Sequence, residues 1–376
     1  MTTKSPTIPF FAVAREATTH QQQYINALRQ VLAHGRVLQG PEVQEFERRI
    51  AEACQRRFAI AVNSCTDALC FALIAAGVKE GDEVLVTDFT FLASASAILR
   101  IGARPVFVDI GPDFNFDLND AQRRITPRCT ALVCVHLFGQ MCSPGAVRAF
   151  CRDNQLRLIE DGAQSFGASR EGRRCGSLGD LSCLSFDPTK TVGAPGSGGV
   201  VLTDDPRLAS KTRALRYHGK DESGEFTGLG YNSQMSTLSA AVLCWKLQCN
   251  EVWRERRRQI AVMYDENLPS DFIIHPQPVC GIHSHHKYVI RHAQRDRLAA
   301  FLKSRGVECG IHYATPLHAT PVMRPWGGTD NDFPCAVSAA REVLSLPIHA
   351  FLTDEEVCRV IDTLDTFSRV HYRIAA

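Results

Sequence analysis

The stretch LSFDPTKTVGAPGSGGVVLTDD, residues 184–205, places one lysine, Lys190, between two apolar runs and beside a glycine-rich loop. The runs, 181–187 and 198–204, are short and unbroken, as is typical of parallel strands buried on both faces. A P-loop would place its lysine after the glycines and directly before a helix. Because Lys190 precedes the glycines and a strand is expected to follow them, we exclude a P-loop. A surface lysine and a Schiff-base lysine, whose pKa burial lowers, remain as interpretations.

Similar apolar runs occur along the chain before this stretch. Rich in Val, Leu and Ile, they predict further buried strands at 82–88, 104–110, 130–138 and 156–161. Helix-like stretches at 66–78 and 91–102 lie between some of them. This alternation predicts an α/β fold with a doubly wound, mostly parallel central sheet flanked by helices.

The pattern changes after a long helical stretch at about 236–267. The segments beyond it predict a smaller α+β domain, and they lie at 286–292, 295–306, 307–313 and 352–367. We therefore expect residues 1–255 to form an N-terminal arm and a large α/β domain, and residues 256–376 to form the smaller C-terminal domain. Residues 1–40 are expected to supply the arm and a helix.

Composition excludes several classes of protein. The net charge of +2 and pI near 7.9 do not favour nucleic acid or an anionic membrane as a partner. No apolar run approaches the roughly 20 residues that span a bilayer, and we expect no signal peptide. The 15 cysteines include no C-x-x-C pair, which indicates reduced thiols and a cytoplasmic protein without a metal site.

Polar residues mark the expected strand ends, where ligands of such sheets bind. Thr66 begins a helix whose free amides could hold a phosphate, Asp161 ends a strand, and Asn232 precedes the long helix. Each could equally be a helix cap or a turn residue. In chain order, however, a phosphate-type helix start, a strand-end acid and a lysine beside glycines meet the needs of pyridoxal 5′-phosphate (PLP).

Several segments resemble one family, the DegT/StrS-type nucleotide-sugar aminotransferases, which are PLP-dependent enzymes of fold type I. The similarity covers nearly the whole chain. It is carried by GRVLQGPEVQEFE (35–47), VHLFGQ (135–140), IEDGAQSFGA (159–168), GSLGDLSCLSFDPTK (176–190), HYATPLHATP (312–321) and LSLPIHAFLTDEE (344–356).

The resemblance implies roles for residues around the cofactor's ring. Lys190 would bind PLP covalently and later move the proton. Asp161 would pair with the pyridine nitrogen, Gln164 would hydrogen-bond the ring hydroxyl, and Phe91 would stack on the ring. Lys190 and Asp161 are thus the expected catalytic residues.

The resemblance also implies a phosphate site that two subunits share. Thr66, Asp67 through its backbone, and Ser185 would hold the phosphate. Asn232 would reach it from the neighbouring subunit, which implies a homodimer with shared active sites.

Four positions depart from the family pattern. Cys65 stands where glycine is more frequent, Pro195 and Ser197 replace an aromatic and an acidic residue, and Asp187 stands where His or Tyr is common. These departures bear on the choice of sugar. The presence of Lys190 argues against the branch of the family that carries histidine there and dehydrates sugars.

Histidines and arginines offer further candidates. The segment HSHH (283–286) is not expected to bind a metal, because neighbouring histidines on a strand alternate faces, and one of them is expected to contact the substrate. The segment RERRRQ (254–259) is expected to be the solvated face of the long helix, although an arginine in it could instead meet a diphosphate. His312, Tyr313 and His318 are weaker candidates for substrate contacts.

These inferences predict an aminotransferase that moves an amino group from L-glutamate to a nucleotide-linked keto-sugar, giving an amino-sugar for a surface polysaccharide or a secondary metabolite. The sequence does not distinguish a 3-keto from a 4-keto sugar. A cyclitol-ketone aminotransferase of antibiotic synthesis and a non-catalytic, PLP-binding regulatory protein of the same fold are the alternatives.

Overall fold

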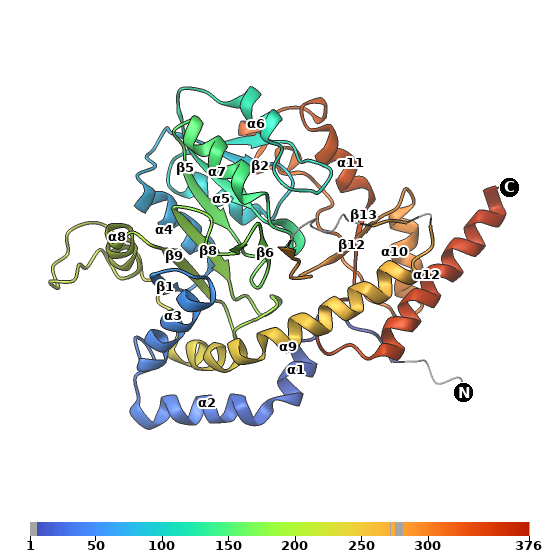
Figure 1. Ribbon diagram of the computed structural model, residues 1–376, viewed down its shortest axis with the longest axis horizontal. Helices are drawn as coiled ribbons and strands as arrows, with labels where there is room; N and C mark the ends of the chain where they lie inside the picture. The colour runs from blue at the N-terminus through green and yellow to red at the C-terminus, as the bar shows by residue number, and fades with distance from the viewer. Residues whose placement is uncertain (1–5, 271, 275–280, 376) are drawn as a thin grey trace.

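The computed structural model describes residues 6–270, 272–274 and 281–375, and its central feature is a seven-stranded sheet (Figure 1). In spatial order the strands are β1 (Phe58–Val62), β9 (Gly199–Thr203), β8 (Leu181–Ser185), β5 (Arg157–Asp161), β4 (Cys129–Val135), β2 (Glu83–Thr87) and β3 (Arg104–Val108). From β8 to β3 every neighbouring pair is parallel. The predicted strands and the mostly parallel sheet are confirmed, and β1 is an additional strand.

One strand runs opposite to our expectation. β9 pairs antiparallel with both β8 and β1, whereas residues 198–204 were expected to form a parallel strand. The cause is the short connection from β8, which contains the glycine-rich loop and no crossover helix. Parallel neighbours need such a crossover, so the chain returns antiparallel.

Helices cover both faces of this sheet. α4 (Cys65–Ala76), α5 (Leu92–Arg100) and α8 (Pro206–Arg216) pack on the face that contains Ile159. The opposite face, which contains Leu158, is covered by α6 (Leu118–Arg124), α7 (Pro144–Asp153) and, toward β1, α3 (Pro41–Ala53). α4 begins at its cap Ser64, whose Oγ accepts from Asp67 N at 3.1 Å, and ends at Gly77 in the left-handed conformation.

The N-terminal arm packs on a long helix. α1 (Val13–Thr19) leads into α2 (Gln21–His34), which lies along the first half of α9 (Thr237–Asn267) through Ala27 and Val31 (Figure 1). α9 confirms the predicted helix at 236–267. It runs without interruption through residue 255, so the domain division that we place there stays a prediction.

The C-terminal part combines strands and helices, as predicted. Its three-stranded antiparallel sheet has the order β10 (Ile273–Ile274), β12 (Tyr288–Arg291) and β13 (Val343–Leu346). The helices are α10 (Arg295–Ser304), α11 (Pro334–Glu342) and α12 (Asp354–Ala375), with short 3-10 turns η1 (Leu137–Gly139), η2 (Leu317–Ala319), η3 (Arg324–Trp326) and η4 (Asp330–Asp332) elsewhere.

A third, small sheet joins the two parts of the chain. It has the order β11 (Gly281–Ile282), β6 (Ser169–Arg170) and β7 (Arg173–Arg174). Among the described residues, no helix combines the length and the apolar character that crossing a membrane requires.

Candidate active site

A cavity of about 300 Å³ lies at the carboxyl ends of β4, β5 and β8. Parallel pairing produces this meeting point, because Asp161 at the end of β5 pairs with Val135 of β4 and Cys183 of β8. Eight predicted site residues line the cavity: Thr66, Phe91, Asp161, Gln164, Ser185, Lys190, His312 and Tyr313.

Lys190 follows β8 in a tight turn. Its backbone amide donates to Asp187 O at 2.9 Å, and Asp187 Oδ1 accepts from Thr189 N at 2.9 Å, a turn that aspartate favours. Burial lowers the pKa of the Lys190 amine below its ordinary value. A lysine of this kind is available as a free amine, which is what attack on a carbonyl requires.

Asp161 is a buried carboxylate with few partners. Ser94 Oγ donates to its Oδ2 at 2.7 Å, and Ala163 N donates to its Oδ1 at 3.1 Å. Burial raises the pKa of Asp161 despite these two hydrogen bonds. A cationic group placed beside it would stabilise the charged form, so the site fits a ring nitrogen that is kept protonated.

Gln164, Tyr313 and Phe91 form one wall of the cavity. Gln164 Oε1 accepts from Phe138 N at 3.0 Å, and its Nε2 donates to Tyr313 OH at 3.0 Å, which fixes the amide's orientation. Phe91 is 58% exposed, and its ring centre lies 6.3 Å from that of Tyr313. An exposed aromatic face at a cavity is suited to stacking on a planar ligand.

The start of α4 also lines the cavity. Among the described residues the amides of Cys65 and Thr66 have no hydrogen-bond partner, and a helix N-terminus favours anions. β9 passes against this turn at Gly199, where a Cβ would overlap the backbone of Ser64 and Cys65. The glycine therefore permits the close approach, and the arrangement fits a phosphate.

Three predicted residues lie outside the cavity of their own chain. Asp67 has its amide bonded to the cap Ser64, and its carboxylate accepts from Ser233 Oγ at 2.7 Å. Asn232 is exposed, and its Oδ1 accepts from Gln234 Nε2 at 3.3 Å. The predicted roles of Asp67 and Asn232 in binding phosphate stay predictions.

His318 is the third of these residues. Its Nδ1 lies 2.7 Å from Asp88 and its Nε2 lies 3.1 Å from Asp330, so both ring nitrogens are engaged. It is buried, and it does not line the cavity. Its position favours a structural role over the substrate contact that we predict from sequence.

Sequence reasoning missed Ser94, Phe11 and Lys287, which also line the cavity. Ser94 lies in the first turn of α5, three residues after its cap Phe91, and that closeness to a predicted site residue is a signal that could have identified it. Of the HSHH segment, His286 reaches the cavity, and its buried Nδ1 has no hydrogen-bond partner in the part of the chain that the structure describes. Among the four departures from the family pattern, Cys65, Asp187 and Ser197 line the cavity, whereas Pro195 does not.

The described residues contain two buried groups that could in principle hold a metal, namely Cys134–His136–Cys142 and His136–Glu160–Cys175. Both include His136, whose Nε2 lies 3.0 Å from Glu160 and whose Nδ1 accepts from Cys142 N at 3.3 Å. Because hydrogen bonds occupy both ring nitrogens, these groups are adequately explained as structural. The HSHH segment belongs to neither.

Comparisons with known proteins found relatives that are similar over most of the chain. The "Pleiotropic regulatory protein" of Geobacillus stearothermophilus is 37% identical over 96% of this chain and 99% of its own length. The "UDP-2-acetamido-2-deoxy-3-oxo-D-glucuronate aminotransferase" of Pseudomonas aeruginosa is 37% identical over 86% of this chain and 90% of its own.

Solved structures are similar over the same extent. DesV of S. venezuelae, in complex with a ketimine intermediate, superimposes with a TM-score of 0.93 at 35% identity, covering 96% of this chain and 99% of that one. NtdA of Bacillus subtilis, with bound cofactor PMP, has a TM-score of 0.89 at 28% identity, covering 97% and 86%. These neighbours confirm the predicted fold.

The match to a family model extends over most of the chain. Residues 18–365 fit the DegT/DnrJ/EryC1/StrS aminotransferase family. That span includes the cavity residues from Thr66 to Tyr313 and the whole seven-stranded sheet. The chain therefore belongs to the DegT/DnrJ/EryC1/StrS aminotransferase family.

Proposed function

We propose that this aminotransferase uses PLP to transfer an amino group from L-glutamate to the ketone of a nucleotide-linked sugar. One observation carries the proposal: a single cavity holds the amine of Lys190, the buried carboxylate of Asp161 and the free amides at the start of α4. Each suits a different part of PLP: the aldehyde, the ring nitrogen and the phosphate. The names of the relatives support a keto-sugar substrate, and that of the P. aeruginosa protein favours a 3-keto group.

When bound, PLP supplies an aldehyde that captures the amino group and a ring that takes up electrons from the neighbouring carbon. The chain's residues bind and orient it. The amides of Cys65 and Thr66, together with Ser185, would hold the phosphate, and Phe91 would cover one face of the ring. Gln164, already fixed by Tyr313, would orient the ring hydroxyl.

Proton transfer falls to Lys190. Because burial lowers the pKa of its amine, Nζ can accept a proton from the donor's α-carbon as a free base. It would return the proton to the cofactor's former aldehyde carbon, on the other side of the shared nitrogen. Asp161 would keep the ring nitrogen protonated, because a buried carboxylate is stabilised by a positive charge beside it. The same two groups serve both halves of the reaction.

A panel assay tests the proposal. The purified protein, loaded with PLP, is incubated with glutamate and 3-keto or 4-keto nucleotide sugars, and 2-oxoglutarate is followed. We expect production that depends on a keto-sugar and is absent in Lys190→Ala. No 2-oxoglutarate with any sugar, or a protein that cannot be loaded with PLP, would contradict the proposal.

A homodimer with shared sites is part of this proposal. Asn232 is exposed on its own chain, and nearby apolar side chains are exposed as well, Phe226 at 70% and Leu229 at 97%. Such side chains favour a covering partner. If the sites are shared, mixing inactive Lys190→Ala and Asn232→Ala subunits should restore activity, because one site of each mixed dimer is intact. Absence of recovery in confirmed mixed dimers would contradict sharing.

We also propose that the protein works in the cytoplasm, since all described cysteines are free thiols, as is usual in a reducing compartment. The name of the G. stearothermophilus relative keeps a regulatory role as the second candidate. A regulator would not need Lys190 and Asp161 arranged for proton transfer. The panel assay separates the two, and a cyclitol ketone added to the panel tests that alternative substrate.

A further inference from the structure

We propose that Lys287 binds a substrate carboxylate at the reacting end of the cavity, and this inference rests on the proposed aminotransferase function. The carboxylate belongs either to the amino donor or to a sugar that carries an acid group. The two sources share one chemistry, and separate half-reactions distinguish them.

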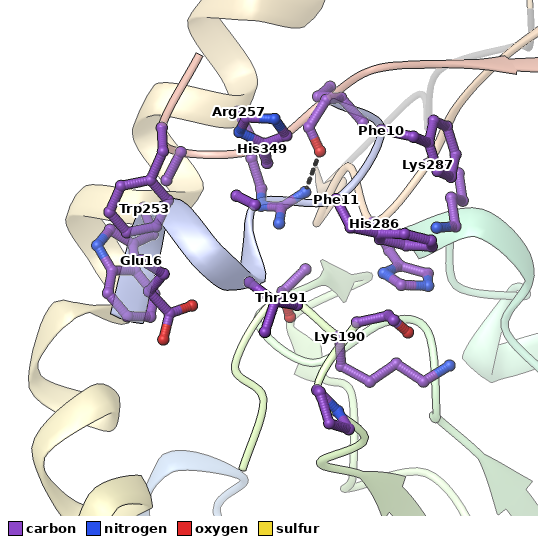
Figure 2. A pocket seen from close by; sticks show the side chains of 17 residues that line it. Phe10, Phe11, Glu16, Lys190, Thr191, Trp253, Arg257, His286, Lys287 and His349 are labelled. Atoms are coloured by element: carbon purple, nitrogen blue, oxygen red, sulfur yellow. Dashed lines mark hydrogen bonds between the residues drawn. The ribbon is translucent and has the colours of Figure 1, made fainter. Parts of the chain in front are cut away.

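The backbone fixes where Lys287 lies. Its amide donates to Phe138 O at 3.1 Å, and Ser284 N donates to Gly139 O at 3.0 Å, so the segment before β12 is tied to the turn η1. η1 follows β4, one of the strands that end at the cavity. Lys287 therefore lines both the cavity and the adjoining recess shown in Figure 2, as do Lys190 and His286.

The side-chain amine of Lys287 is buried beside two aromatic rings. The side chain is 7% exposed, and Nζ lies 4.2 Å from the ring centre of Phe11 and 4.6 Å from that of Phe10. Among the described residues, no carboxylate lies within ion-pair distance of it. Aromatic faces offset only part of the cost of burying a charge, so Lys287 is poised to gain from an anion.

A second buried lysine, Lys246, has the partners that Lys287 lacks among the described residues. Lys246 is 3% exposed, forms an ion pair with Glu16 and donates to the Gly193 carbonyl. Lys287 has no such pair, and its pKa is lowered well below the ordinary value by burial and then by Lys190 and Arg257. The contrast indicates that its partner is a ligand.

Other groups at the same wall add to the demand for an anion. Arg257 is buried, and its Nη1 donates to Ile348 O at 2.7 Å, whereas its Nε has no partner among the described residues. His286 Nδ1 is likewise buried and unpartnered.

Three acids line the cavity and the recess, and each has partners of its own. Glu16 pairs with Lys246, Asp161 accepts from Ser94 and Ala163, and Asp187 accepts from Thr189. Among the described residues, none of these acids pairs with Lys287.

The place of the anion follows from which residues surround Lys287. The free amides that suit a phosphate belong to a different element, the start of α4. Figure 2 shows the amines of Lys190 and Lys287 extending to the same side of the recess. In the donor, a carboxylate is attached to the carbon whose proton Lys190 removes. A carboxylate held by Lys287 would keep that carbon beside Lys190, which makes Lys287 a positioning and specificity-determining residue.

The test uses the PLP-loaded enzyme and measures each half-reaction alone by the change in cofactor absorbance. Lys287→Gln removes the charge, Lys287→Arg keeps it, and exposed Lys303→Gln is the matched control. We expect Lys287→Gln to weaken apparent binding of glutamate, or of an acidic keto-sugar, by about tenfold to a hundredfold, the range of a charged hydrogen bond. Lys287→Arg should restore most of it, and a neutral keto-sugar should be unaffected.

Loss for glutamate alone identifies the donor's carboxylate, and loss for the acidic sugar alone identifies the sugar's. If neither changes in Lys287→Gln, the proposal is wrong. Calorimetric binding of glutarate, an unreactive dicarboxylate, is a second readout, and equal affinity in wild type and variant would also overturn the donor assignment. Lys287→Met, which keeps packing on Phe10 and Phe11, serves if the Gln variant does not fold. If wild type itself shows no half-reaction, the proposed function fails instead.

Discussion

Two neighbouring residues of β5, Glu160 and Asp161, are both buried carboxylates, and the protein treats them in opposite ways. Glu160 Oε1 accepts from His136 Nε2 at 3.0 Å and Gly176 N at 2.8 Å. Its Oε2 accepts from Leu178 N at 2.8 Å and Ser182 Oγ at 2.6 Å. Among the described residues, Asp161 has only two hydrogen-bond donors, Ser94 and Ala163.

The pKa values follow the partners. Burial alone would raise the pKa of Glu160, but hydrogen bonds from His136, Ser182 and backbone amides lower it to about 2. The pKa of Asp161 is raised, because burial exceeds its two hydrogen bonds. Side chains alternate along a strand, so Glu160 faces the core beside Leu158 and Asp161 faces the cavity. The fold thus supplies Glu160 with enough hydrogen bonds to stabilise its charge, whereas the charge of Asp161 is left for a ligand to stabilise.

The largest effect is expected at the cavity. Lys190→Ala removes the amine that moves the proton, so we expect amino transfer to fall by at least about 10³-fold with the fold retained. Borohydride should fix PLP covalently to the wild type and not to the variant. The half-reaction with glutamate measures the rate, and Lys303→Ala is the control on the surface.

Substituting the structural carboxylate, Glu160, should lower the stability of the fold. In Glu160→Gln one oxygen becomes an amide NH₂ that faces two donors, so we expect a loss of about 3 kcal/mol in unfolding free energy. Urea unfolding measures it. Glu52→Gln, at an exposed position in α3, should change the unfolding free energy by less than about 0.5 kcal/mol.

Low pH should also lower the unfolding free energy of the wild type, because acid protonates Glu160. Because the pKa of Glu160 is lowered from 4.5 to about 2 in the fold, its stabilisation is present above pH 4.5 and is lost as pH falls toward 2. The loss is about 3 kcal/mol. Urea unfolding at several pH values should show this slope in wild type and a weaker slope in Glu160→Gln, and identical slopes would contradict it.

The smallest effect is expected from removing one hydrogen bond to Asp161. Ser94→Ala removes one of its two donors, so its pKa should rise further. We expect about a tenfold lower rate, with the acid limb of the pH–rate profile shifted to higher pH, because a carboxyl group with a raised pKa stays protonated up to a higher pH. An unchanged acid limb would show that Ser94 does not act through Asp161. Ser96→Ala, on the same helix, is the matched control.

Local patterns predicted much of the fold and the site. Continuous apolar runs predicted six strands of the central sheet, and Asp161 and Lys190 were recognisable because they follow such runs. The direction of β9 was not predictable from burial, because antiparallel and parallel central strands are equally apolar. It depends on the absence of a crossover helix after β8.

Contacts between distant segments were not predictable from local patterns. His318 is engaged by Asp88, which is far from it in sequence, and nothing around His318 signals that pair. Lys287 becomes notable only when Phe10 and Phe11 of the N-terminal arm pack on it. Both cases depend on tertiary packing, which decides whether a polar residue is satisfied or left free.

The most direct test compares Asp161→Asn with Glu160→Gln in one experiment, measuring unfolding free energy and the rate of amino transfer for each. We predict that Asp161→Asn keeps its stability within about 1 kcal/mol, because an amide satisfies the same two partners, and loses at least about 100-fold in rate. Glu160→Gln should lose stability while its folded fraction keeps most of the rate. An Asp161→Asn protein that unfolds as readily as Glu160→Gln, or that keeps the wild-type rate, would contradict the division between a structural and a functional carboxylate.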